Sequence, residues 1–202
     1  MRAERQRRPP QPPAATPAPA RFLGTPYDVP AARPIALAPR GSAFEMQDAD
    51  HPNWCWAAVA ASISAHLATA ANPPKSQCDI ATLCRGFNCC PPLPPDWKGD
   101  KPWPLEDALA KVNHDGGGPI RVSNELTFDL IRSEIAANRP VGCHIYWDND
   151  PGHFIAIVDC VDETREFVVR DPSKVTHYNG CYTLEALKSL GGGRWDYYYP
   201  TV

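Results

Sequence analysis

The first long apolar stretch of the chain predicts a buried helix. From Trp54 to about Ala70 nearly every residue is Ala, Val, Ile, Leu or Ser, and the stretch contains no Gly or Pro. Apolar residues would cover every side of such a helix, which is typical of a helix at the centre of a domain. Asn53 precedes the stretch and is a residue type preferred at helix N-caps. We therefore expect the helix to begin directly after Asn53.

Apolar residues at helical spacing predict three further helices. The helix at residues 102–113 has one apolar face, formed by Leu105, Ala108, Leu109 and Val112. The helix at residues 126–140 has Thr127 as its N-cap. Its apolar stripe contains Phe128, Ile131 and Ile135. A short last helix, at residues 183–190, has Thr183 as its cap and ends at a run of three glycines.

The pattern changes after Pro140. Four short runs rich in β-branched and aromatic residues follow, separated by residues typical of turns. They are VGCHIYW, HFIAIVDCV, EFVVRD and RWDYYYP, which begin at residues 141, 153, 166 and 194. These runs predict strands. Helices followed by strands indicate an α+β fold, in which we expect two lobes that meet at a cleft.

Proline and arginine set the first residues apart from the rest of the chain. The first 40 residues hold ten of the 24 prolines and seven arginines. We interpret residues 1–38 as a disordered Pro/Arg-rich arm, because this stretch cannot bury enough apolar surface to fold. The arm has a basic start but no apolar run, so it does not resemble a signal peptide. No stretch of the chain predicts a membrane span.

The charge of the chain bears on its partners. The net charge is −3, and since the arm is basic, the remaining residues carry an acidic excess. Binding to nucleic acid depends on basic surface that neutralises phosphates. We therefore expect no nucleic-acid partner.

Four of the eight cysteines form a cluster before a proline-rich stretch. Their spacing lacks the paired C-x-x-C pattern of structural zinc sites, so we expect no metal there. We expect disulfides that staple an irregular loop instead, which implies an oxidising destination. Adjacent cysteines favour two distant partners over each other, but the sequence leaves the pairing open among Cys78, Cys84, Cys89 and Cys90. Two other cysteines lie within predicted strands and are expected in the core, namely Cys143 and Cys160.

Cys55 lies at the first turn of the predicted central helix, between two tryptophans. A buried structural cysteine and a nucleophile both fit this position. The backbone N–H groups and the dipole at a helix N-terminus stabilise an anion, which favours a thiolate. The same N–H groups can receive the oxyanion of a tetrahedral intermediate. On the nucleophile hypothesis, Trp54 and Trp56 pack the helix start and line a cleft that the sulfur faces.

A thiolate nucleophile needs a base, and His153 is the strongest candidate among the six histidines. It follows Pro151 and Gly152 and opens an apolar strand, which would hold the ring in one orientation. His177, in a polar segment, is the best rival. His51, directly before the central helix, is expected to be solvated.

The spacing of the strands predicts a carboxylate partner for His153. The runs HFIAIVDC and EFVVRD predict a hairpin centred near residue 162 or 163. Antiparallel pairing about this centre brings His153 within one diagonal step of Asp171. Cβ atoms of such neighbours lie roughly 5–8 Å apart, within reach of a hydrogen bond. Asp171 is therefore predicted to orient His153. Gln47, eight residues before Cys55, could donate an amide N–H to the same oxyanion.

Together these residues resemble the papain-like cysteine peptidases. The matching motifs are Q-x7-C-W-A at residues 47–57, G-H-F at 152–154 and R-D-P at 170–172. The run WCWAAVAASI and the later CCP are similar to the compact bacterial branch, which includes proteases delivered into host cells. The likeness covers about residues 43–200. The interval between the Gln and the Cys is longer than in papain, and the third residue is Asp rather than Asn.

The resemblance implies a role for each matching residue. Cys55 would be the nucleophile, His153 the general base and acid, Asp171 the orienting carboxylate and Gln47 the oxyanion donor. The resemblance implies neither a cofactor nor a metal. The implied fold is the papain-like α+β fold, with a helical lobe around a central helix and a lobe built on an antiparallel sheet.

The resemblance also implies a domain organisation and an activity. Residues 39–202 would form the catalytic domain, with the helical lobe at about 39–118 and the β lobe at about 119–202. The activity would be hydrolysis of peptide bonds through a thioester acyl-enzyme.

Other activities fit the same residues. A deamidase, a transglutaminase or a peptidoglycan amidase would use the same triad, and a non-catalytic binding module could share the fold. We expect a protein or peptide substrate, such as a protein of a host or a competitor. We also expect export or delivery outside the producing cell, without a recognisable signal peptide.

Overall fold

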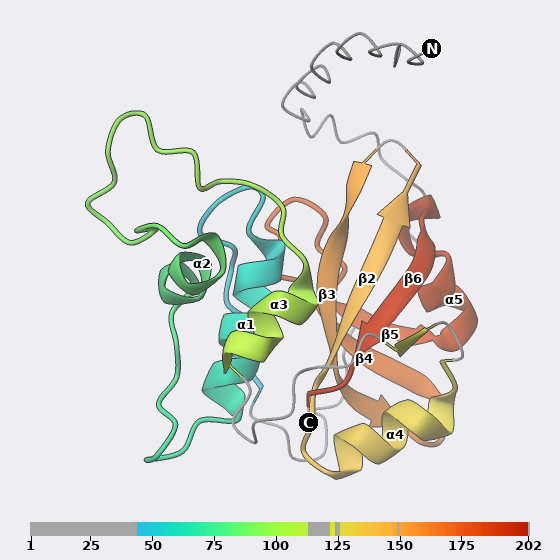
Figure 1. The fold of residues 1–202 in the computed structure, drawn as a ribbon. Coiled ribbons are helices and arrows are strands. Elements are labelled where there is room, and N and C mark those ends of the chain that lie inside the picture. Colours follow the sequence, from blue (N-terminus) through green and yellow to red (C-terminus); the bar gives the residue numbers. More distant parts are fainter. Residues whose placement is uncertain (1–43, 113–121, 124–125, 149, 202) are drawn as a thin grey trace, which may run out of the picture.

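The structure of the protein is a computed structural model that describes residues 44–112, 122–123, 126–148 and 150–201. The predicted arm at residues 1–38 lies outside this part of the chain. Figure 1 shows helices α1, α2 and α3 gathered beside an antiparallel sheet, with α4 and α5 on other sides of the strands. The predicted α+β class is therefore confirmed.

The central helix, α1, covers Cys55–His66 and is buried along most of its length. It begins where the sequence predicts, but Asn53 is not its cap. The N-cap is Trp54, which makes no side-chain capping bond. Asn53 instead donates its backbone N–H to Oδ1 of Asp100 at 2.9 Å and points its amide at the Asp100 carbonyl. The helix ends earlier than expected, because the chain turns at residues 69–72 through reciprocal backbone hydrogen bonds.

The second helix, α2, corrects the prediction of an irregular cysteine-rich loop. It covers Gln77–Arg85 and therefore includes two of the four clustered cysteines. Ser76 and Asp79 form a capping box, in which each side chain accepts the backbone N–H of the other residue. Gly86 closes the helix in the left-handed conformation, at φ 74°. The motif S-x-x-D and the later Gly were the sequence signals for this helix.

The other helices agree with the sequence. Helix α3 covers Leu105–Val112 and buries the four apolar residues predicted for its face. Helix α4 covers Phe128–Ala136 and α5 covers Leu184–Lys188, each capped by the threonine predicted for it. A 3₁₀ turn, η1, follows at Leu190–Gly192. None of the helices in the described ranges has the length and apolar character needed to cross a membrane.

Six antiparallel strands form one sheet in the order β1-β6-β2-β3-β4-β5. Four of them match the predicted runs, although the longest begins three residues earlier than its run. Two short strands were not predicted. The strands are β1 Val122–Ser123, β2 Val141–Trp147, β3 Asp150–Val161, β4 Glu166–Arg170, β5 Gly180–Thr183 and β6 Arg194–Tyr199.

Successive side chains along the strands belong to two different hydrophobic clusters, one on each face of the sheet. On β3, Phe154 and Ala156 pack with residues of α1, α2 and α3. The residues between and after them, Ile155 and Ile157, pack on the other face with residues of α4 and α5. Successive side chains of a strand point to opposite faces, so helices cover this sheet on both sides. This arrangement explains why the strand sequences are nearly continuous apolar runs.

Candidate active site

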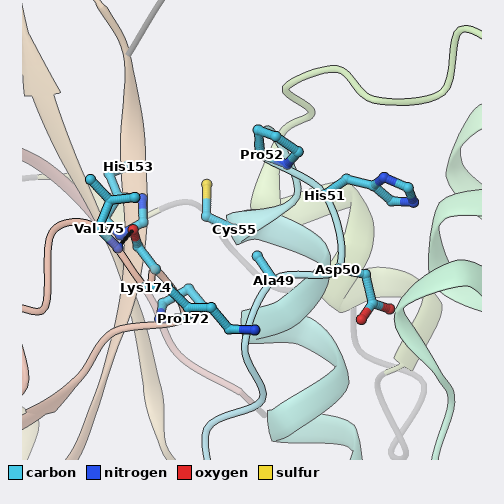
Figure 2. Close-up of a pocket in the computed structure, with 10 residues that line it drawn as sticks. Ala49, Asp50, His51, Pro52, Cys55, His153, Pro172, Lys174 and Val175 are labelled. Atoms are coloured by element: carbon cyan, nitrogen blue, oxygen red, sulfur yellow. Dashed lines mark hydrogen bonds between the residues drawn. The ribbon is translucent and has the colours of Figure 1, made fainter. Parts of the chain in front are cut away.

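Cys55 is the first residue of α1 and lines a pocket of about 210 Å³ together with His153. The thiol is half-buried and makes no disulfide. Figure 2 shows it at the start of the helix, between two stretches of chain that form the walls of the pocket. One wall is the segment 49–52, which precedes the helix, and the other is the loop 172–175, which follows β4.

His153 lies near the start of β3, and Gly152 makes room for this arrangement. Gly152 has φ +88°, which side chains rarely adopt. A Cβ there would lie 2.2 Å from Nε2 of His144 and 2.7 Å from the carbonyl oxygen of Ile145. Ile145 is the residue that pairs with His153 across β2 and β3. The glycine therefore lets the strand begin close to β2, and His153 is held there with only 4 % of its surface exposed.

Asp171 follows the last residue of β4 and meets His153 as the predicted hairpin requires. The register pairs Ala156 with Arg170, and a bulge between Ile157 and Asp159 shifts the rest of the hairpin by one residue. Asp171 therefore lies diagonally across from His153. Its Oδ1 is 2.7 Å from Nε2 of the ring. Because Nε2 is engaged by the carboxylate, Nδ1 is the ring nitrogen left for Cys55, which lines the same pocket.

The carboxylate of Asp171 also organises the loop that follows it. Oδ1 accepts the backbone N–H of Ser173 at 2.7 Å, in addition to the bond with the ring. Oδ2 accepts the hydroxyl of Thr176 at 2.5 Å and the backbone N–H of Tyr178 at 2.9 Å. The loop 172–178 thus wraps around a buried charge. Part of this loop is a pocket wall, so Asp171 holds both the ring of His153 and the wall in position.

Electrostatics favour a charged pair inside the pocket. Burial by itself lowers the pKa of His153, but the charge and hydrogen bond of Asp171, with a further contribution from Cys55, raise it to about 10. Burial by itself raises the pKa of Asp171, yet the charge of His153 and the donated hydrogen bonds hold it below its usual value. At neutral pH the ring is therefore an imidazolium and its partner a carboxylate.

Gln47 is not among the residues that line the pocket. Its backbone N–H donates to the Oγ of Ser62 on α1 at 2.9 Å, and its side-chain oxygen accepts from Nε2 of Gln77 on α2 at 3.3 Å. The structure thus brings Cys55, His153 and Asp171 together directly. It places Gln47 two residues before the wall segment 49–52.

The two walls of the pocket were missed by the sequence analysis. Ala49 donates its backbone N–H to the carbonyl of Pro172 at 2.9 Å, and the exposed pair Lys174–Asp48, at 3.2 Å, joins the same two segments. Val175 lines the pocket with 67 % of its surface exposed. The only signal for these residues was their position next to Cys55 and Asp171 in the sequence.

The structure corrects the predictions for one histidine and two tryptophans. His51 was expected to be solvated, but it lines the pocket and packs edge-on against Trp54, with ring centroids 4.4 Å apart. Trp54 and Trp56 do not line the pocket, because both are fully buried. Their indole N–H groups donate to the carbonyls of Gly99 and Lys101, so they fasten the 99–101 segment to the helix start.

The rival candidate base, His177, is exposed and lies outside the pocket.

The cysteine cluster holds one disulfide, between Cys78 and Cys90. Asp79 lies beside this pair, but the two sulfurs bond to each other and do not form a metal-ligand set. Cys84 and Cys89 are free. Of the cysteines predicted in the core, Cys143 is fully buried, and Cys160 is partly buried against the α4-side cluster.

A thiol at a helix start, facing an imidazole that a buried carboxylate holds, defines a thiol hydrolase of the papain-like class. The family model for the papain-like cysteine protease AvrRpt2 (Peptidase_C70) matches residues 40–188. The chain belongs to this family of bacterial effectors and is a papain-like cysteine peptidase. Family membership implies a protein substrate. No curated protein matches the chain.

Proposed function

We propose that the protein hydrolyses peptide bonds through a thioester acyl-enzyme, with Cys55 as the nucleophile and His153 as acid and base. The observation that carries this proposal is the position of His153, between the carboxylate of Asp171 and the thiol of Cys55 in one pocket. Asp171 orients the ring and stabilises its charge. The raised pKa of His153 keeps a proton on the ring, where the leaving amine needs it.

The first half of the reaction acylates the enzyme. The thiolate of Cys55, paired with the imidazolium of His153, attacks the carbonyl carbon and forms a C–S bond, and the carbonyl oxygen becomes an oxyanion. The backbone N–H of Cys55 is free to hold this oxyanion, because the first N–H groups of a helix have no partner within it. The side-chain amide of Gln47 is the second donor. His153 gives its proton to the amine nitrogen, the C–N bond breaks, and a thioester remains.

The second half of the reaction releases the acid. His153, now neutral, takes a proton from a water molecule as the water oxygen attacks the thioester carbon. The C–S bond breaks, and the thiolate of Cys55 and the imidazolium are restored. The carboxylate of Asp171 keeps its charge throughout, because its pKa lies below its usual value.

We further propose that the catalytic domain is residues 39–202, with two lobes at about 39–118 and 119–202. The pocket between segments 49–52 and 172–175, which come one from each part, supports this division. The arm at residues 1–38 and the effector character of the family support delivery outside the producing cell. A host or competitor protein is then the target.

A proteome-wide cleavage profile tests the activity. Wild-type protein added to a proteome should create new peptide N-termini that are absent with Cys55→Ala and with His153→Ala. Cys160→Ser and His177→Ala are matched controls, because their side chains lie outside the pocket, and both should give the wild-type profile. Glutamine-to-glutamate conversion or cross-linked products without new N-termini would instead indicate a deamidase or a transglutaminase. Cleavage of peptidoglycan alone would indicate an amidase.

A further inference from the structure

Gln77 is a buried side chain outside the pocket that binds the segment carrying Gln47. It is the first residue of α2, and only 3 % of its surface is exposed. Its Nε2 donates to the carbonyl of Asp48 at 2.8 Å and to Oε1 of Gln47 at 3.3 Å. Its Oε1 accepts the backbone N–H of Asp50 at 3.0 Å. One side chain thus bonds with three residues of the segment 47–50.

The backbone partners fix which way the amide of Gln77 faces. The carbonyl of Asp48 can only accept a hydrogen bond, and the N–H of Asp50 can only donate one. The Nε2 of Gln77 must therefore face Asp48, and on the same side it meets the side chain of Gln47. Only an acceptor can face a donor, so Gln47 turns its oxygen to Gln77. The amide nitrogen of Gln47 then points away from Gln77, with its N–H groups available.

The segment is held from the side of the nucleophile as well. The backbone N–H of Gln47 donates to Oγ of Ser62 at 2.9 Å, and this buried hydroxyl donates to the carbonyl of Ala58 within α1. The main chain at Gln47 is thus fastened to the helix of Cys55, and its side chain is fastened to α2. The next residues of the chain form the pocket wall beside Cys55 (Figure 2).

We propose that Gln77 is a positioning residue of this peptidase. It turns the amide nitrogen of Gln47 toward the oxyanion that forms when Cys55 attacks, and it holds the wall at Asp50. Gln77 itself touches neither the substrate nor the reacting atoms. The inference rests on the proposed role of Gln47 as oxyanion donor.

Gln77→Glu is the sharpest variant, because it keeps the shape of the side chain and removes its donors. The new carboxylate still accepts from the N–H of Asp50. It loses the hydrogen bond to the carbonyl of Asp48 and repels Oε1 of Gln47, so the Gln47 amide turns over and donates to the carboxylate. An oxygen then faces the oxyanion. We expect kcat to fall about 100-fold with KM within about threefold of wild type, since the loss of one oxyanion donor costs about 10²–10³ in rate.

Gln77→Met serves as a second variant. It has a similar volume but neither repels nor turns the Gln47 amide, which then samples both orientations. We expect kcat to fall about tenfold. Thr82→Val is the matched control on α2, because Thr82 accepts the backbone N–H of Cys89 and does not bind the segment 47–50. It should keep the kcat of wild type.

Two reagents separate positioning from a general loss of structure. Iodoacetamide alkylates the thiol of Cys55 without an oxyanion, so its rate should be unchanged in both Gln77 variants. A peptide aldehyde forms an adduct whose oxygen occupies the oxyanion position, so its affinity should fall in parallel with kcat. If alkylation slows as much as hydrolysis, the pocket is damaged as a whole and the proposal is wrong.

A double variant that combines Gln77→Glu with Gln47→Ala tests whether Gln77 acts through Gln47. If Gln77 acts through Gln47, then Gln77→Glu should cost less than about twofold in the Gln47→Ala background. A full additional loss there would overturn the positioning role and leave the oxyanion role of Gln47 intact. If Gln47→Ala alone keeps wild-type kcat while Cys55→Ala is inactive, the oxyanion assignment itself is wrong, and the inference falls with it.

Discussion

At the scale of single residues, the carboxylate of Asp171 explains a departure from papain, which has Asn in this place. Oδ1 accepts from the ring of His153, and Oδ2 accepts the backbone N–H of Tyr178. An amide has only one oxygen, so an Asn here would direct an NH₂ group at one of these donors. A buried donor that faces another donor loses its hydrogen bond, at a cost of about 1–3 kcal/mol. The loop 172–178 therefore requires Asp.

Replacing this carboxylate should change the pH dependence of the reaction. In wild type the folded-state pKa of His153 lies near 10, above the usual value, so activity should decline only as the pH rises toward that value and the ring loses its proton. Asp171→Asn removes the charge that raises the pKa, and burial then lowers it. We expect the alkaline limb of kcat/KM to move to lower pH, and its plateau to fall by about 10²-fold or more.

Steady-state rates between pH 5 and pH 10.5 measure both effects. Asp159→Asn is the matched control, because Asp159 is the other buried carboxylate of the hairpin and does not line the pocket. It should leave the alkaline limb in place. An unshifted limb in Asp171→Asn would contradict the ion pair as the source of the raised pKa.

At the scale of elements, the start of β3 and the helix α2 decide how the site is supported. Near its start, strand β3 has Gly152, with φ +88°, packed against β2, and His153 follows directly. Helix α2 is pinned at its first turn by a capping box and by the disulfide from Cys78 to Cys90. Its first residue, Gln77, binds the segment before the nucleophile. The rigid starts of β3 and α2 therefore fix the position of His153 and of the segment that precedes Cys55.

Gly152→Ala should impair catalysis by displacing this strand. The new Cβ clashes with the carbonyl of Ile145, the partner of His153, so the imidazole shifts relative to the thiol. We expect kcat/KM to fall about tenfold or more, because small misplacements of a catalytic group have large effects on rate. Gly86→Ala is the control, since Gly86 also has positive φ (+74°) but nothing lies within 4 Å of its added Cβ. It should lose stability yet keep wild-type kcat/KM.

Cys78→Ser should destabilise the protein through the unfolded chain. The disulfide joins residues separated by 12 positions, and closing a loop of this size stabilises a fold by about 3 kcal/mol. Urea unfolding without reductant should show a decrease of about this size in the free energy of unfolding. Cys84→Ala, on the same helix and at an unbonded cysteine, should cost clearly less. With reductant present, wild type and Cys78→Ser should unfold at the same urea concentration; a persistent difference would argue against the disulfide as its cause.

At the scale of the whole molecule, the sheet joins two hydrophobic clusters and the site lies where its hairpin meets the central helix. Cys55 comes from α1, which packs with the cluster on one face. His153 comes from β3, whose alternating residues enter both clusters. The pocket walls touch through the bond from Ala49 to Pro172. Catalytic geometry therefore depends on the packing of the molecule as a unit.

The segment 39–202 should be active on its own. The described residues within it contain both clusters and all four proposed site residues, and the family match begins at residue 40. We expect its kcat/KM on a peptide substrate to lie within about twofold of the full chain, and its thermal midpoint to be unchanged. A large loss on removal of residues 1–38 would show that the arm contributes to the folded enzyme.

Much of this architecture could be predicted from the chain. A run that is apolar on every side gave α1, helical spacing gave α3 and α4, and runs rich in β-branched and aromatic residues gave four strands, because packing and pattern agree there. Helix α2 was missed, since its four-cysteine neighbourhood suggested a stapled loop and its capping box was not recognised. The prediction of Asn53 as the N-cap was wrong, because its side-chain amide donates to the carbonyl of Asp100, 47 residues away, and does not cap the helix.

The sequence alone determined the chemistry of the site: a cysteine at a helix start, and a histidine and an aspartate at the ends of one hairpin. These are local facts, since helix periodicity and hairpin register depend on neighbours in the chain. Tertiary structure alone decided what surrounds them. It brought α1 against β3, made the loop 172–178 a pocket wall, and set Gln77 against the segment of Gln47. Contacts between distant segments depend on how both faces of the sheet are filled, which no local pattern records.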